Sequence, residues 1–202
     1  MREFPLAQIE EWRPGESDGP ELPSEIDGLA EVLHAAVHAG ASVSFVLPFS
    51  LEEARSFWRE QVLPSVRRKA RRVLVARVDG EIAGTVQLNL ETPPNQPHRA
   101  EVVKLLVHPK ARRQGVARAL MTALEDSARA EGRWLLTLDT RTGDLAEPLY
   151  RSMGYVTVGV IPRYARNPHL TDFEGTTVMY KELRTDPSRI TGAAPRRDIA
   201  SK

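Results

Sequence analysis

A basic turn with a single glycine separates an apolar segment of this chain from an amphipathic one. Arg112, Arg113 and Gly115 lie in this turn, and the amphipathic segment begins at Val116. The first backbone N–H groups of a helix have no partner within the helix, and the helix dipole favours an anion there. Gly115 would also let the main chain approach that anion closely. The pattern therefore predicts a phosphate site, although it is neither a Walker A loop nor a dinucleotide fingerprint.

Two carboxylates lie in segments that are otherwise apolar. Glu101 is near the start of the segment 99–107, and Asp139 is near the end of the segment 134–140. A carboxylate in an apolar strand needs either a partner or a chemical role. One interpretation is a catalytic base. The other is a polar cluster in which Glu101, Asp139 and Lys104 only pair with one another, and the sequence leaves both interpretations open.

Hydrophobic periodicity predicts two helices and a hairpin in the first half of the chain. Gly40 ends the first helical pattern, and Ser50 with Glu53 has the spacing of a capping box for the second. Asp79-Gly80 suits the tight turn of a hairpin. The predicted elements are a weak strand at 4–12, helices at 26–37 and 51–62, and hairpin strands at 73–78 and 82–90.

The second half of the chain predicts a βαβ unit followed by two more strands. Because a helix connects the strands 99–107 and 134–140, these two strands should be parallel. The remaining elements are a helix from 116 that ends near Gly132, a short helix through Met153, strands at 155–161 and 176–183, and a loop at 162–173. The predicted fold is α/β, with about four helices and a mixed, largely antiparallel sheet of about six to seven strands around the parallel pair.

Length and composition restrict the class of protein. The 202 residues, 41% of them hydrophobic, suffice for one domain at 21–183, flanked by a poorly defined strand or loop at 1–20 and a disordered tail at 184–202. The net charge of +1 lacks the positive excess of a nucleic-acid binder. The absence of cysteine excludes disulfides and thiolate sites. We expect a cytoplasmic protein without a membrane partner, because no apolar run approaches the length of a membrane span.

Two motifs of this chain resemble those of the GCN5-related N-acetyltransferase (GNAT) superfamily. They are Arg112-x-x-Gly115-x-Ala117 and Ala146-x-x-x-Tyr150-x-x-x-Gly154-Tyr155. The resemblance implies acetyl-CoA as co-substrate, with its pyrophosphate on the basic turn and its pantetheine arm between two splayed parallel strands. The cofactor-binding residues that it implies are Leu105, Leu106, Val107, Arg112, Arg113, Gln114, Gly115, Val116, Ala117 and Arg118.

The resemblance also assigns roles in acetyl transfer to an amine. The amine must lose a proton to attack the thioester, and the departing thiolate must gain one. Tyr150 is the implied acid: its ordinary pKa of about 10 lies above the roughly 8.5 of a thiol, so the phenol keeps its proton at neutral pH and can donate a hydrogen bond or proton to the leaving sulfur. Glu101 and Asp139 are the implied base, with water relaying the proton. The alternative for Tyr150 is a core tyrosine that only packs the short helix on the sheet.

A closer resemblance, to the tabtoxin resistance family, covers most of residues 28–183. It rests on the segments 40–45, 99–105, 138–140 and 158–164. That family acetylates the amino group of a small amino-acid β-lactam toxin, which implies a small-molecule amine as acceptor and a role in antibiotic or toxin resistance. GNAT enzymes are often dimers, so a homodimer is a further expectation. Gly143 departs from the superfamily pattern, which usually has asparagine there.

Two loops should wall the acceptor site, because loops on a rigid sheet usually carry specificity. The predicted acceptor-binding residues are Ser42 and Phe45 in the first loop and Arg163 and Tyr164 in the second, with Arg166 as the alternative to Arg163 for binding a substrate carboxylate. No metal site is predicted, since the one helical histidine pair, at 34 and 38, has no third ligand spaced with it. Two rival functions stay open: acetylation of a protein or peptide N-terminus in an open groove, and non-catalytic binding of acyl-CoA.

Overall fold

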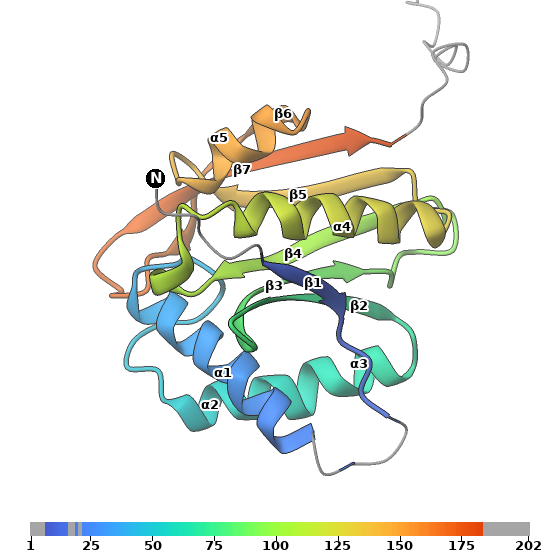
Figure 1. Cartoon of the computed structure of the whole chain (residues 1–202). Coiled ribbons are helices and arrows are strands. Elements are labelled where there is room, and N and C mark those ends of the chain that lie inside the picture. The colour runs from blue at the N-terminus through green and yellow to red at the C-terminus, as the bar shows by residue number, and fades with distance from the viewer. Residues whose placement is uncertain (1–6, 16–18, 20–21, 184–202) are drawn as a thin grey trace, which may run out of the picture.

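The structure is a computed structural model that describes residues 7–15, 19 and 22–183. Figure 1 shows one twisted sheet with helices on both faces. Among the described strands, only β4 and β5 pair in parallel, and all other pairs are antiparallel. The predicted α/β fold, with a largely antiparallel sheet around one parallel pair, is therefore confirmed. The predicted tail at 184–202 lies outside the described residues.

Seven strands form the sheet in the order β1-β2-β3-β4-β5-β7-β6. They are β1 Gln8–Glu11, β2 Arg71–Val78, β3 Glu81–Asn89, β4 Arg99–Val107, β5 Leu135–Arg141, β6 Val156–Arg166 and β7 Phe173–Glu182. The β2–β3 hairpin forms as predicted. Its turn residues Asp79 and Gly80 have φ angles of 52° and 85°, and positive φ at both positions is what a type I′ turn requires.

The strand β6 is longer than the sequence predicts. The predicted loop began at Pro162, but β6 continues to Arg166. Pairing with β7 resumes at Ala165 after a register shift that follows Ile161. Because β6 is an edge strand, a proline and a bulge can be accommodated without breaking a central ladder. This prediction was wrong because edge position cannot be read from local sequence.

The helices are α1 Leu22–His38, α2 Leu51–Ser56, the π-helical η1 Phe57–Val62, α3 Leu63–Arg67, the 3-10 helix η2 Pro109–Ala111, α4 Val116–Ala130 and α5 Ala146–Ser152. The segments α2, η1 and α3 follow one another without a break and make one helical rod. The predicted capping box of α2 is confirmed, because Glu53 N–H donates to Ser50 Oγ at 3.2 Å and Ser50 N–H donates to Glu53 Oε2 at 2.7 Å. No helix among the described residues is long and apolar enough to cross a membrane.

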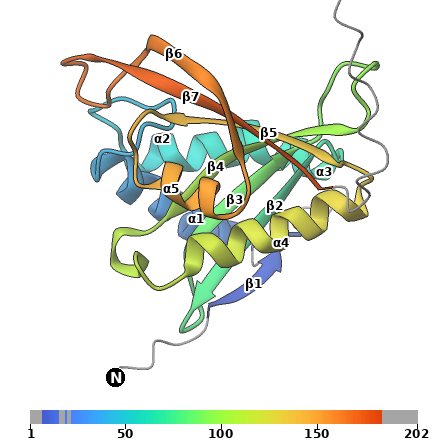
Figure 2. The same ribbon diagram turned by 90° about the horizontal axis from the view of Figure 1, so that it is seen from above.

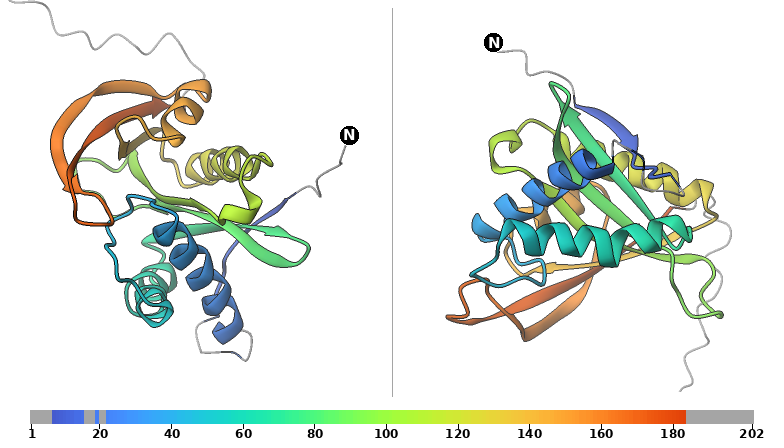
Figure 3. Two further views of the ribbon diagram at one scale, coloured as in Figure 1. Left: turned by 90° about the vertical axis from the view of Figure 1, so that its left-hand side faces the viewer. Right: turned by 90° about the horizontal axis from the view of Figure 1, so that it is seen from below.

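Helices cover the two faces of the sheet and create two cores. The left panel of Figure 3 shows α4 and α5 on one face and α1 with the α2–α3 rod on the other. Leu120 and Leu124 of α4 pack against the first face, and Leu29 of α1 and Trp58 pack against the second, all fully buried. Burial of each such side chain contributes about 1.5–3 kcal/mol. The sheet is thus a rigid platform for the residues at its edges.

The β6–β7 hairpin reaches back toward the loop that joins α1 to α2. Figure 2 shows the hairpin as a long pair of strands at one side of the sheet. Leu47 N–H in the α1–α2 loop donates to Pro168 O in the β6–β7 turn at 2.8 Å. This hydrogen bond joins the two segments that the sequence predicts as walls of the acceptor site.

Candidate active site

The parallel strands β4 and β5 pair only at their N-terminal ends. Their register joins Arg99 to Leu135 and Glu101 to Thr137, and it contains no later pair among the described residues. Beyond Glu101, β4 stays with β3 and β5 stays with β7. The backbone edge of β4 that faces β5 is therefore available to an extended ligand, which could pair with it as an added strand does.

The predicted cofactor contacts Leu105, Leu106 and Val107 form the end of β4 beside this gap. Leu106 is buried in the core under α1, whereas Leu105 and Val107 pack against the core under α4. Their side chains thus stabilise the fold. It is their backbone groups that remain for a ligand in the gap.

The basic turn leads from the end of β4 into α4. Gly115 is the N-cap of α4 with a φ of 81°, and Ala119 N–H is the first to donate back to it, at 3.0 Å. The N–H groups of Val116, Ala117 and Arg118 precede that first bond, so the helix supplies no acceptor for them. A side chain at Gly115 would meet no atom within 4 Å. The turn therefore has donors, a favourable dipole and open space for a phosphate group.

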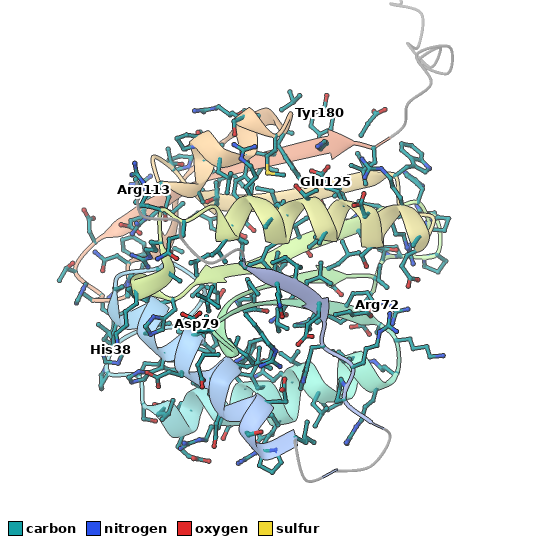
Figure 4. All side chains as sticks on the ribbon, in the orientation of Figure 1. His38, Arg72, Asp79, Arg113, Glu125 and Tyr180 are labelled. Carbon is teal, nitrogen blue, oxygen red and sulfur yellow. The ribbon has the colours of Figure 1, made fainter. Side chains whose placement is uncertain are left out.

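The basic side chains of this turn are directed to its surface. Arg112 and Arg113 are exposed, and Figure 4 shows Arg113 at the N-terminal end of α4. Arg118 is also exposed and donates to Ser152 Oγ of α5 at 2.6 Å. Gln114 is used within the turn, since its side-chain amide donates to Lys110 O at 3.2 Å. Arginines at the rim of a phosphate site can bind it in bidentate fashion.

We expect Gly115→Ala to weaken acetyl-CoA binding roughly tenfold, about 1.4 kcal/mol, because the new methyl group projects into the space proposed for the pyrophosphate. The matched control is Gly132→Ala at the other end of α4. Gly132 also has a positive φ, 68°, and open space around it, so both variants carry the same backbone strain. Calorimetry should show an increased Kd only for Gly115→Ala; equal affinities in the two variants would contradict the placement.

Tyr150 lies on α5 and is buried in the core that α4 covers, with its ring centroid 5.7 Å from that of Tyr155. Burial raises the pKa of its hydroxyl well above the ordinary value, and the charges of Asp144 and Asp139 raise it further. No other described residue makes a hydrogen bond to this hydroxyl. Tyr150 is therefore protonated at neutral pH and can act as a proton donor.

The structure brings Glu101 and Asp139 to one cavity. This cavity has a volume of about 200 Å³, and Thr137, Tyr164 and Thr176 also line it. We call it the smaller cavity, because a second cavity next to it is larger. Glu101 is half-buried on β4, and Asp139 is exposed at the end of β5, where its Oδ2 accepts a hydrogen bond from Thr176 Oγ1 at 2.9 Å. Two carboxylates on adjacent strands thus face one space that a small molecule or water can enter.

The alternative of a self-paired polar cluster is not what the structure shows. No ion pair joins Glu101, Lys104 and Asp139 among the described residues. Lys104 Nζ instead donates to Val43 O at 2.7 Å and contacts Ser44 Oγ at 3.3 Å. The carboxylates of Glu101 and Asp139 are therefore not neutralised by this lysine through direct contact.

A larger cavity of about 270 Å³ adjoins the smaller one, and both are lined by Asp139, Tyr164 and Thr176. The predicted acceptor residues Ser42 and Phe45 line the larger cavity, together with Ser44, Val46, Thr140, Arg141, Ala165, Arg166, Glu174 and Gly175. Its walls come from the α1–α2 loop and from the β6–β7 hairpin, as the sequence predicts. The carboxylate of Asp139 lies where the two cavities meet.

Arg163 is the predicted acceptor residue that the structure places elsewhere. It is exposed on the bulge of β6 with a φ of 52°, and it is not among the residues that line the two cavities. Arg166 lines the larger cavity instead. Arg141 and Glu174 also line the larger cavity, but they were not predicted from the sequence. The alternation of residues along β5 and β7 indicates which side chains share a face, but it does not show that a cavity lies there. A strand bulge changes which side chains share a face, and the sequence does not reveal it.

Gly143 has a φ of 79°, which an asparagine tolerates less easily than glycine. Its N–H donates to Glu147 Oε2 of α5 at 2.8 Å. The ring centroids of the α1 histidines His34 and His38 are 4.2 Å apart, and both rings contact Phe49: the His34 ring centroid is 6.4 Å from that of Phe49, and His38 Nε2 lies 2.8 Å from Phe49 O. Among the described residues, no group of three or more His, Cys, Asp or Glu side chains is close enough together to hold a metal ion.

Several known proteins are similar to this chain. A curated relative from Azospirillum brasilense, an uncharacterized N-acetyltransferase in the hisH-hisA intergenic region, is 35% identical over 127 residues, which are 61% of this chain and 73% of the relative. An N-acetyltransferase structure from Staphylococcus aureus Mu50 superposes with a TM-score of 0.71 at 15% identity, covering 89% of this chain and 99% of that one.

The structure of yncA from Salmonella typhimurium, solved with its cofactor acetyl-CoA, superposes with a TM-score of 0.69 at 17% identity and covers 90% of this chain and 96% of that one. These likenesses below 25% identity concern the fold. The model of the acetyltransferase (GNAT) family matches residues 35–155, which include the gap between β4 and β5, the basic turn before α4 and Tyr150. This protein therefore belongs to the GNAT family of acetyltransferases.

Proposed function

We propose that the protein transfers the acetyl group of acetyl-CoA to the primary amine of a small, amino-acid-like molecule, by direct attack within a ternary complex. The observation that carries this proposal is the position of Asp139. Its carboxylate lies where the smaller and the larger cavity meet. Asp139 is near the C-terminal end of β5, the strand that separates from β4 after Glu101. A group there can reach an amine in the cavities and a thioester in the gap.

The residues of the gap and the turn fit acetyl-CoA. The pyrophosphate would bind to the free N–H groups at the start of α4 and to three exposed arginines, Arg112, Arg113 and Arg118. The free backbone edge of β4 from Val102 to Val107 would align the pantetheine arm. Acetyl-CoA supplies the activated thioester, and the chain supplies position and proton transfer.

Proton transfer is assigned to three side chains. Glu101 and Asp139 accept the proton of the attacking amine, directly or through water in the smaller cavity. As the new C–N bond forms, the C–S bond of the thioester breaks. Tyr150 donates its hydroxyl proton to the departing thiolate, and the raised pKa of Tyr150 ensures that this proton is present at neutral pH.

The charges of the larger cavity favour a zwitterionic acceptor. Arg141 is neutralised by Asp144 at 3.2 Å and by Glu174 at 3.5 Å. Arg166 has no acidic partner among the described residues and lies over the Phe173 ring, 5.0 Å from its centroid. Asp139 could therefore bind the ammonium group of an amino-acid-like acceptor while Arg166 binds its carboxylate. Such an acceptor suits a resistance role like that of the tabtoxin resistance family.

A protein N-terminus as acceptor would need an open groove. The hydrogen bond between Leu47 N–H and Pro168 O closes the cavity wall at one end and favours a small acceptor. Turnover with acetyl-CoA across a panel of amines and N-terminal peptides, followed through release of free CoA, tests the proposal. We expect turnover with small amino acids and a raised Tm with acetyl-CoA. Absence of acetyl-CoA binding in calorimetry would refute the function, and turnover of peptides alone would refute the acceptor class.

The edge strand β6 offers a surface for a second copy of the chain. Val156, Val158 and Val160 of this strand are each more than half exposed, and an exposed apolar edge strand readily pairs with another chain. We expect a homodimer in sedimentation velocity of the full chain, and Val158→Lys should shift it toward monomer. A wild-type protein that sediments as a monomer at all concentrations would contradict this expectation.

A further inference from the structure

Lys104 lies on a bulge of β4, in the stretch where the strand has left β5. Thr85 of β3 pairs with Leu106 and Gln87 pairs with Val103, so one residue of β3 faces two of β4. Lys104 is one of these two and has a φ of 53°. Residues other than glycine rarely adopt this left-handed backbone conformation. Bulges of this kind redirect a side chain and are over-represented next to active sites.

The redirected side chain contacts the α1–α2 loop. Lys104 Nζ donates to Val43 O at 2.7 Å, lies 3.3 Å from Ser44 Oγ, and is 5.4 Å from the centroid of the Phe45 ring. Ser44 also has a left-handed φ, 71°. Left-handed backbone is thus found at both ends of one contact, and backbone of this kind clusters at functional sites.

The charge of Lys104 strengthens this contact. Burial and, to a smaller extent, the charge of Arg71 on β2 lower the pKa of Lys104 to about 8, although the charge of Asp139 on β5 acts in the opposite direction. The ammonium group is therefore still mainly charged at neutral pH. Hydrogen bonds from a charged donor are shorter and stronger than neutral ones. Water weakens them little when the donor is mostly buried, because the local dielectric constant is low.

The loop that Lys104 holds is the wall of the larger cavity. Ser42, Ser44, Phe45 and Val46 line that cavity. The loop is tied at its ends by Arg141 Nη1, which donates to Gly40 O at 3.2 Å, and by Leu47 N–H, which donates to Pro168 O. Lys104 supplies the connection between these two ends. Lys104 also lies within the electrostatic influence of Asp139, the carboxylate to which the proposed function assigns the amine.

We propose that Lys104 is a positioning residue for the acceptor: its ammonium group, carried by the β4 bulge, holds the wall 42–46 in the shape that binds the acceptor beside Asp139. The inference rests on the proposed function for the identity of the ligand, but the contact between Lys104 and the wall 42–46 is a property of the ligand-free protein. It predicts that Lys104 governs the acceptor KM and has little influence on acetyl-CoA.

The test compares Lys104→Met, Lys104→Arg and Lys69→Met. Methionine keeps an unbranched stem but cannot donate, and arginine restores a charged donor. Lys69 is an exposed lysine with a left-handed φ of 60°, so Lys69→Met is a matched control for the loss of charge at such a backbone. Hydrogen exchange of amides 41–47 in the ligand-free protein should be at least about tenfold faster in Lys104→Met and near wild type in the other two.

Steady-state kinetics should then separate the two substrates. We expect Lys104→Met to raise the acceptor KM about tenfold or more with the acetyl-CoA KM within about twofold, and Lys104→Arg to recover most of the loss. Wild-type exchange at 41–47 in a folded Lys104→Met, or an equal rise in both KM values, would overturn the proposal. If no amine is acetylated, the proposed function fails. The exchange experiment still decides whether Lys104 holds the wall 42–46 in place. Should Lys104→Met fail to fold, Lys104→Leu, which also lacks a donor, replaces it with the same expected outcomes.

Discussion

Replacing Tyr150 with phenylalanine is expected to lower kcat roughly tenfold to a thousandfold, while acetyl-CoA affinity and Tm stay near wild type. The change removes one oxygen and keeps the ring, so the packing of α5 on the sheet is preserved and no large cavity opens. If the hydroxyl protonates the departing thiolate, its loss removes general acid catalysis, which contributes about 10² to 10⁴ in rate in enzymes generally. The hydroxyl has no hydrogen bond from another described residue, so little stability should be lost with it.

Tyr155→Phe is the matched control for this experiment. Tyr155 is as buried as Tyr150, its ring packs against that of Tyr150, and its hydroxyl is buried without a hydrogen-bond partner among the described residues. Removing a buried, unpaired hydroxyl should leave kcat unchanged and should not lower Tm. Near-wild-type kcat in Tyr150→Phe together with a lower Tm would show a structural tyrosine and would remove the proposed acid.

The second large effect is expected for Glu101→Gln and Asp139→Asn. Each change removes a proton acceptor from the smaller cavity while keeping the shape of the side chain, so turnover at neutral pH should fall about a hundredfold or more. The loss should shrink at high pH, where more of the free amine is already deprotonated and needs no base. Acetyl-CoA affinity should be retained in both variants, because neither residue lies on the phosphate turn.

A pH series of kcat/KM on both single variants and on the double variant tests this assignment. If Glu101 and Asp139 serve one proton relay, the double variant should be no worse than the worse single variant, because residues that act as a unit are non-additive. Glu91→Gln is the control, since Glu91 is an exposed carboxylate paired with Arg68 on the surface. Wild-type turnover across the pH series in both single variants would leave the carboxylates with a structural role only.

Local rules were enough for the elements that depend on near neighbours in the chain. Periodicity and turn chemistry predicted the β2–β3 hairpin at Asp79-Gly80, and the Ser50–Glu53 spacing predicted the cap of α2. The strand–turn–helix pattern before Gly115 predicted the start of α4 and its free N–H groups. These features were predictable because the interactions that stabilise them join residues only a few positions apart.

The sequence by itself thus determined the fold class, the basic turn before α4 and the types of side chain proposed for acetyl transfer. Only the tertiary structure decided how these side chains meet: that Glu101 and Asp139 share a cavity, that Arg166 rather than Arg163 lines the larger cavity, and that Lys104 donates to Val43 O of the α1–α2 loop. The physical reason is that strand register and bulges set which side chains share a face. They are determined by packing and pairing across the whole sheet, between residues far apart in the chain.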